Sequence, residues 1–319
     1  TNGGSEPVFC TIVPPHVLDK LARNDDPALS GTTAAATYKV AITEQRTGRI
    51  LLFDRTAQWT DANVRWSFST GNAPGWDHPF EIRFRDTRRY GMIALMTFGR
   101  PGEGRAAIVN VTSKAHLTRA DLLWSARVTS YPHSIERVPD AGTVVVAGSR
   151  DRLHVFGPSG SDPATLKEVQ TLEFAKAHAV LWDDQNKLLW VTGGTVVRSY
   201  RVTGSMRDSR LVKHGPDITI AGNGHDLQPD YSRPGTLLVA DSHHVYSLDK
   251  KTRALTTAAS LPYPKSYVRH ANGQAMWTTD PNAEDSVWGG PTVHFSAGGD
   301  RTRAGARIYK ARLYTTQFH

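Results

Sequence analysis

Short apolar runs alternate with polar turns along the chain from about residue 38 to its end. The runs are β-branched or aromatic and bounded by Gly, Asp, Asn or Pro, as in RILLFD, VVVAGS, LLWVTGG and TLLVADS. Such runs are typical of short buried strands. Turn-forming residues separate them, as in PDAGT, DDQNK and DKKTR. No long stretch after residue 30 has helical periodicity, so the pattern predicts an all-β protein.

The strands are grouped into repeated units, four of which begin with histidine. His133 opens HSIERVPDAGTVVVAGS, His178 opens HAVLWDDQNKLLWVTGG, and His225 opens HDLQPDYSRPGTLLVADS. A related unit begins at His78. The histidines recur at intervals of roughly 45 to 55 residues, a length that suits four strands per unit. Repeats of this kind predict a β-propeller.

Three further β-rich units complete the repeat pattern. They begin at Tyr38, at Ser266 and at the segment GPTVHF near residue 290. Counting all units, the sequence predicts a seven-bladed β-propeller over residues 38–319. The segments KVAITEQ and RIYKARLYTTQF at its two ends are expected to share one blade. Such closure removes the unpaired strand edges that would recruit other chains.

Residues 1–37 differ in composition and are expected to form a separate N-terminal extension. Pro15 precedes a short apolar helix pattern at Val17, Leu18 and Leu21, and a Gly/Ala/Thr-rich linker follows. The chain begins at Thr1 rather than Met, and TNGGSEP has the character of a processed leader. We therefore expect a mature, secreted, extracellular protein.

The charge and hydropathy of the chain argue against two classes of partner, nucleic acids and membranes. The net charge is +8 and the pI about 9.6, but the 38 Lys and Arg residues are scattered. Without a basic run or an interleaved aromatic stripe, we expect no nucleic-acid partner. No apolar run approaches the roughly 20 residues that a membrane-spanning helix requires, so no membrane partner is expected either. We expect a monomer.

The repeated histidines have two possible roles at the propeller axis. The first strand of each blade lines the central channel, so these side chains should form a partial ring. Their imidazoles could hydrogen-bond neighbouring blades and fix the packing. Alternatively, they could bind a metal or act as general acid and base. Repetition favours the structural role, because a repeated residue usually belongs to the repeated fold.

The catalytic alternative is similar to seven-bladed polysaccharide lyases and rhamnosidases that act on rhamnose–glucuronate linkages. That resemblance implies a base from His133, His178 or His225, with Tyr267 and Arg269 beside the substrate carboxylate. The sequence contains no H-E-x-x-H, G-x-S-x-G, Walker or Rossmann signature. We expect no metal and no cofactor.

A short motif in the extension suggests a different class of function. Cys10–Leu18 has the pattern C-x-x-x-P-P-x-x-L. It resembles the propeptide motif of protealysin-like metalloproteases of the thermolysin (M4) family. Alternatively, its apolar residues could pack on the propeller as a clasp. The predicted contact residues are Cys10, Ile12, Val13, Pro14, Pro15 and Leu18.

Together, the leader, this motif, the basic propeller and the missing catalytic signatures resemble the family of dispase autolysis-inducing proteins. These are secreted bacterial propellers that drive neutral metalloproteases into self-digestion. The resemblance implies a non-catalytic protein that binds a thermolysin-type metalloprotease.

The same resemblance implies contact with a secreted transglutaminase, for which Gln45, Gln170 and Gln317 are candidate substrates. Trp76 and Trp288 lie in Gly/Pro-rich segments and are predicted as exposed anchors for the protease, because binding hot spots favour tryptophan.

Overall fold

The computed structural model describes residues 37–280 and 287–319. These residues belong to one compact unit. The predicted N-terminal helix and six of the predicted contact residues lie outside the described residues; they are Cys10, Ile12, Val13, Pro14, Pro15 and Leu18.

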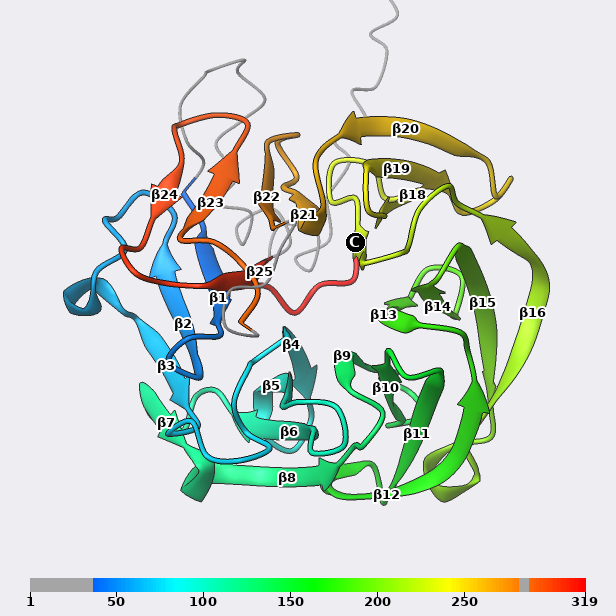
Figure 1. Ribbon diagram of the computed structural model, residues 1–319. Helices are drawn as coiled ribbons and strands as arrows, with labels where there is room; N and C mark the ends of the chain where they lie inside the picture. Colours follow the sequence, from blue (N-terminus) through cyan, green and yellow to red (C-terminus); the bar gives the residue numbers. More distant parts are fainter. Residues whose placement is uncertain (1–36, 281–286) are drawn as a thin grey trace, which may run out of the picture. The chain divides into compact units, whose positions relative to one another are not determined.

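Six β-sheets are arranged radially around one axis, so the described chain is a β-propeller with six blades (Figure 1). Blade 1 contains β25 (Ile308–Leu313), β1 (Lys39–Glu44), β2 (Arg49–Asp54), β3 (Trp66–Ser69) and β7 (His116–Thr118). Blade 2 contains β4 (Glu81–Thr87), β5 (Gly91–Phe98), β6 (Arg105–Asn110) and β8 (Leu122–Arg127). Blade 3 contains β9 (Pro132–Arg137), β10 (Val144–Gly148), β11 (Arg152–Ser159) and β12 (Asp162–Glu173).

The remaining three blades follow the same inside-to-outside order. Blade 4 contains β13 (Ala177–Asp183), β14 (Leu188–Gly193), β15 (Val196–Thr203) and β16 (Arg210–Thr219). Blade 5 contains β17 (Asp226–Pro229), β18 (Thr236–Ala240), β19 (His244–Asp249) and β20 (Leu255–Ser260). Blade 6 contains β21 (Pro264–Arg269), β22 (Ala275–Thr279), β23 (Thr292–Phe295) and β24 (Arg301–Thr302).

Helix is confined to three single turns in the described part of the chain. They are the 3-10 turns η1 (Asp61–Asn63), η2 (Arg119–Asp121) and η3 (Met206–Asp208). Within residues 37–280 and 287–319, no helix has the length and apolar character needed to cross a bilayer. The all-β prediction is confirmed.

The predicted number of seven blades is wrong, because the last two predicted units do not each form a blade. The segment GPTVHF supplies β23, which pairs with β22 and therefore completes the blade that begins at Pro264. The strand β25 leaves that unit and pairs with β1 instead. The strands of the last predicted unit are therefore divided between blade 6, which takes β23 and β24, and blade 1, which takes β25.

The ring is closed as the sequence predicts, with its two ends in one blade. Val40 pairs with Leu313 and Ala41 with Arg312 in antiparallel register. β25 is thereby the innermost strand of blade 1 and also contacts β21 and β4 of the neighbouring blades. Pairing with β25 leaves β1 no free edge on its inner side.

Alternation along the innermost strands separates the core from the axis. In β4, Ile82 and Phe84 are buried in the apolar layer shared by blades 1 and 2. The intervening residues Glu81, Arg83 and Arg85 are buried as well, but they contact the inner strands of other blades. Because neighbouring side chains of a strand point to opposite faces, alternate residues of β4 face the apolar core and the propeller axis.

Candidate functional site at the propeller axis

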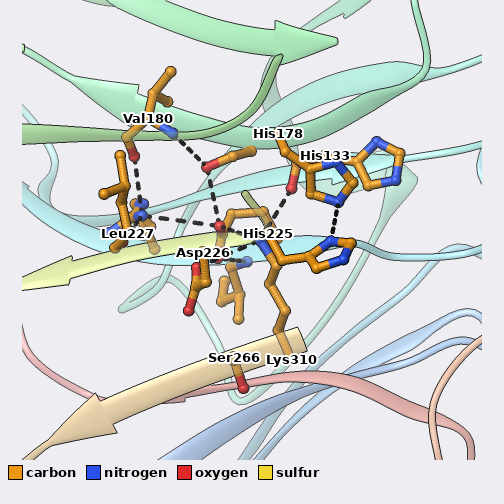
Figure 2. A network of polar contacts seen from close by, with 12 residues as sticks. His133, His178, Val180, His225, Asp226, Leu227, Ser266 and Lys310 are labelled. Carbon is orange, nitrogen blue, oxygen red and sulfur yellow. Dashed lines mark hydrogen bonds and ion pairs between the residues drawn. The ribbon is translucent and has the colours of Figure 1, made fainter. Parts of the chain in front are cut away.

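Three of the repeated histidines meet at one end of the axis, where their inner strands begin (Figure 2). The ring centroids of His133 and His178 are 4.1 Å apart, and those of His178 and His225 are 4.8 Å apart. In blade 2, Phe80 completes this arrangement, with its centroid 4.4 Å from that of His133. The predicted partial ring of histidines is confirmed for three of its four members.

The fourth histidine, His78, has a local role. Its backbone has a positive φ of 51°, and its Nδ1 lies 2.9 Å from Oδ2 of Asp77. Burial lowers the pKa of its imidazole, while the Asp77 carboxylate raises it. This pair lies in the segment that leads into β4.

Each of the three axial imidazoles has a hydrogen-bond partner, and His178 and His225 are bonded to each other. His178 Nε2 lies 3.1 Å from the Tyr309 hydroxyl and 3.4 Å from His225 Nδ1. His133 Nδ1 lies 2.9 Å from the carbonyl oxygen of Tyr131. Burial lowers the pKa of His133 to about 3, and it lowers the pKa values of His178 and His225 well below the usual value. All three are therefore neutral at pH 7.

A network of buried ion pairs lies next to the histidines, further along the inner strands. Arg312 of β25 donates to Glu81 at 2.8 and 2.9 Å and to Asp226 at 2.7 and 2.9 Å. Lys310, two residues earlier, donates to Glu81 at 3.2 Å and lies 3.6 Å from Asp226. One strand therefore supplies two cations for the carboxylates of blades 2 and 5.

Blade 3 joins the same network through Glu136. Arg85 donates to both oxygens of this carboxylate, at 2.8 and 2.7 Å. Arg83 lies 3.8 Å from it and donates to the carbonyl oxygens of Val180 and Leu227 at 3.0 and 3.1 Å. These contacts connect blades 2, 3, 4 and 5 across the axis.

The network keeps its carboxylates ionised in spite of burial. Burial alone would raise the pKa of Glu81, but Arg312, Lys310 and Arg83 together lower it well below its usual value. Burial would likewise raise the pKa of Glu136, and Arg85 and Arg83 lower it. Among the described residues, the charged groups at the axis are therefore buried and paired with one another.

The far end of the axis is covered by the segment after β25, which runs across the centre of the ring (Figure 1). The Phe318 ring lies 4.2 Å from the guanidinium carbon of Arg85. The carbonyl oxygen of Gln317 accepts from Tyr231 Oη at 3.2 Å, and Thr316 Oγ1 donates to Asp86 at 2.7 Å.

The residues predicted for a lyase site do not form one site. Arg269 is at the end of β21 that lies away from the histidines. It forms an isolated β-bridge with Asp230, and its guanidinium donates to the Asp230 carboxylate at 2.6 Å. Tyr267 is buried between blades 5 and 6, where its ring stacks on Trp277. The geometry brings His133, His178 and His225 together but gives no support to the predicted lyase set.

The prediction that Trp76 is exposed is wrong. Its side chain is 8% exposed and packs against Phe98 at a centroid distance of 5.6 Å, because the Gly/Pro-rich segment folds it onto blade 2. Trp288 is half-buried, with the Lys265 ammonium 4.8 Å from its ring.

The three candidate glutamines also differ in exposure. Gln45 is buried and its amide oxygen accepts from the Trp288 backbone, so the suggestion that it is a transglutaminase substrate is not supported. Gln170 accepts from the backbone nitrogen of Leu211 at 2.7 Å. Gln317 is exposed.

Sequence reasoning singled out the histidines and missed the charged residues below them. A signal was available, because EIRFR in β4 and KAR in β25 alternate charged and apolar residues within strands that had to be buried. In a half-exposed strand such charges would face water. In an innermost propeller strand they face the axis, where they need partners of opposite charge.

Within the ranges that the structure describes, no group of three or more His, Cys, Asp or Glu side chains is placed to hold a metal ion.

Comparison with known proteins identifies the sequence family and the fold. Residues 78–318 match a family of unknown function, DUF6528. No curated protein matches the sequence. The fold is similar to a protein of unknown function from Bacteroides caccae, with a TM-score of 0.55, 11% identity and coverage of 87% of this chain and 99% of that one.

Two other solved structures share the fold. A chain of a nidogen/laminin complex gives a TM-score of 0.59 at 12% identity, over 88% of this chain and 100% of that one. The WD40 propeller domain of Doa1 gives a TM-score of 0.50 at 12% identity, over 85% of this chain and 79% of that one. At these identities the likeness establishes a β-propeller and nothing about activity.

Proposed function

This chain belongs to the DUF6528 family, and we propose that it is a secreted, non-catalytic propeller that binds a thermolysin-type neutral metalloprotease and promotes its autolysis. The non-catalytic part of the proposal rests on one observation, which is that the acidic residues at the axis are buried and paired. Its carboxylates Glu81, Glu136 and Asp226 are all buried and bonded to cations of the same protein. Groups held in this way are positioned to join blades rather than to react with a substrate.

The choice of partner rests on the sequence. The motif at Cys10–Leu18 resembles a propeptide segment of M4 metalloproteases, and this motif together with the basic propeller resembles the family of autolysis-inducing proteins. A rigid binding protein can act on a protease by favouring a conformer with a loosened surface loop. It shifts that equilibrium only by its difference in affinity for the two conformers. A second protease molecule then cleaves the loosened loop.

The contact surface that we propose lies at the histidine end of the axis. Tyr263 is 39% exposed and lies 5.4 Å from His243, centroid to centroid. Trp288 lies beside Lys265, and Lys265 follows Tyr263 by two residues in the sequence. Partly exposed aromatic rings next to a cation are the kind of residues that dominate binding energies at protein interfaces. Trp288 therefore remains a proposed anchor, joined here by Tyr263.

Incubation of the protein with a purified thermolysin-type protease tests this function. We expect intact protease, followed on a gel, to disappear faster with the propeller than without it. A parallel sample in which the protease is inhibited by a chelator should show no loss, because the propeller itself does not cleave. An unchanged protease band over an excess of propeller would refute the proposal, and loss in the chelated sample would refute its non-catalytic part.

A pair of variants tests the contact surface. The double variant Tyr263→Ala/Trp288→Ala should lose most of the effect on the protease. Val212→Ala removes an exposed apolar side chain from another blade, 50% exposed on β16 of blade 4, and should keep the effect. Equal activity of both variants would place the contact elsewhere.

A further inference from the structure

An open cleft on the rim of the propeller is lined by basic residues from two blades. It encloses about 510 Å³ between the β13–β14 turn, β15 and β16 of blade 4 and the β19–β20 turn of blade 5. Six of its lining residues are cationic or imidazole side chains, and none of the described lining residues is acidic: Lys187, Arg201, His214, Lys250, Lys251 and Arg253.

Some of these cations are already neutralised by the protein. Lys250 is buried and donates to Asp183 at 2.8 Å. Lys187 donates to Asp184 at 2.7 Å. By contrast, Arg201, Lys251 and Arg253 have no carboxylate within ion-pair distance among the described residues. The cleft therefore carries excess positive charge.

Arg253 is held rigidly at the inner wall of the cleft. Its guanidinium donates to the carbonyl oxygens of Pro216 and His214 at 2.8 and 3.0 Å and to Ser199 Oγ at 2.6 Å, and it lies over the Trp190 ring. All of these partners are neutral, so its charge is oriented but not cancelled. Fixed cations bind anions with a smaller loss of side-chain entropy than mobile ones.

Arg201 and Lys251 supply the exposed side of the same cleft. Both residues are exposed. Arg201 Nε donates to His214 Nδ1 at 3.0 Å, which leaves its terminal nitrogens free for a bidentate contact with a carboxylate.

We propose that this cleft binds an acidic peptide segment of a partner protein, at a site separate from the histidine end of the axis. The proposal does not depend on the autolysis function. Peptide is favoured over nucleic acid and over sugar because the described lining contains no Phe, Tyr or Trp side chain, and its one imidazole, His214, is hydrogen-bonded to Arg201. Leu188 and Val202 instead offer small aliphatic contacts between the charges. An acidic chain with intervening aliphatic residues matches this surface.

Fluorescence anisotropy with a labelled peptide that alternates Glu and Ala tests the proposal on the full chain. We expect saturable binding that weakens with added salt, and no binding of the same peptide with Gln in place of Glu. Equal binding of the Gln peptide would refute recognition of carboxylates. Polygalacturonate is the competing anion. If it binds at the cleft and the peptide does not, the cleft is not a peptide site.

Charge-matched variants separate the cleft from the general basicity of the protein. Arg201→Gln/Lys251→Gln should weaken peptide binding by about tenfold or more. Lys39→Gln/Lys167→Gln removes the same charge at exposed positions outside the cleft and should change it by less than about twofold. An equal loss in both double variants would overturn the proposal. All four substitutions are at exposed positions, and circular dichroism checks that each variant is folded.

Discussion

Glu81 and Arg312 are 231 positions apart in the sequence and are joined by two hydrogen bonds of 2.8 and 2.9 Å at the centre of the propeller. The pair connects the first strand of blade 2 to the closing strand of blade 1. Asp226 of blade 5 binds the same guanidinium. One side chain thus joins three blades.

Replacing Arg312 by Met should be strongly destabilising. Two carboxylates would be left buried without their main cation, so we expect a loss of about 3–5 kcal/mol in the free energy of unfolding. Chemical denaturation measures it. Arg65→Met is the control, because the Arg65–Asp54 pair is on the surface, and it should cost about 1 kcal/mol or less. Similar losses in the two variants would show that the axial network does not stabilise the ring.

Stability should fall in acid because the axial histidines are buried in the neutral form. In the unfolded chain a histidine takes up its proton near pH 6.5, whereas His133 does so only near about 3. Between these pH values the unfolded state binds more protons, so the free energy of unfolding decreases as the pH falls from 6.5 toward 3. Above 6.5 these groups contribute no pH dependence. Each contributes a slope of up to about 1.4 kcal/mol per pH unit.

Denaturation at several pH values checks this slope. His133→Phe removes one of the groups and places a ring next to Phe80, so the slope should become shallower. Ile135→Val, a buried apolar change on the same strand β9, removes no titratable group and should keep the slope of the unaltered chain. A His133→Phe slope equal to that of the unaltered chain would contradict the proposed burial of a neutral imidazole.

Ser266→Ala should destabilise the joint between blades 6 and 1. The Ser266 hydroxyl accepts from the backbone nitrogen of Ala311 at 3.1 Å, and both groups are buried. Loss of this acceptor leaves an unsatisfied N–H, with an expected cost of about 1–3 kcal/mol in the free energy of unfolding. Thr302→Ala removes a hydroxyl from an exposed Thr–Thr contact and should be nearly neutral. Equal losses in the free energy of unfolding would mean that the buried hydrogen bond does not contribute more than the exposed one.

Gln317 is the glutamine that we expect a transglutaminase to modify. Its side chain is exposed, whereas Gln45 is buried. Incorporation of a labelled primary amine, located by peptide mass spectrometry, should occur at Gln317 and be lost in Gln317→Asn. Gln170→Asn is the matched control and should keep the labelling. Labelling that persists unchanged in Gln317→Asn would disprove the assignment.

Much of the fold could be predicted from local patterns. Short β-branched runs and turn residues indicated the strands, and the spacing of His133, His178 and His225 identified the start of three inner strands. The number of blades could not be obtained in the same way. The segment near residue 290 looks like a new unit, and only its pairing with β22 shows that it completes an earlier one.

The candidate site was predicted in part. Repetition identified the histidines, but Glu81 and Asp226 find their cation in a strand at the other end of the chain, and no local spacing indicates such a pairing. Exposure was equally hard to predict. Trp76 and Trp288 both lie among Gly and Pro residues, yet Trp76 is buried against Phe98 and Trp288 is half-buried.

The position of β25 has a consequence for biosynthesis. A ribosome that has translated only as far as residue 307 has already released Glu81 and Asp226, but it has not yet made Lys310 or Arg312. Until those residues emerge, the carboxylates stay hydrated and the inner side of β1 is unpaired. The codons for β25 therefore decide when five complete sheets and an incomplete sixth become a closed ring, and nascent chains paused before them are the form most in need of a chaperone.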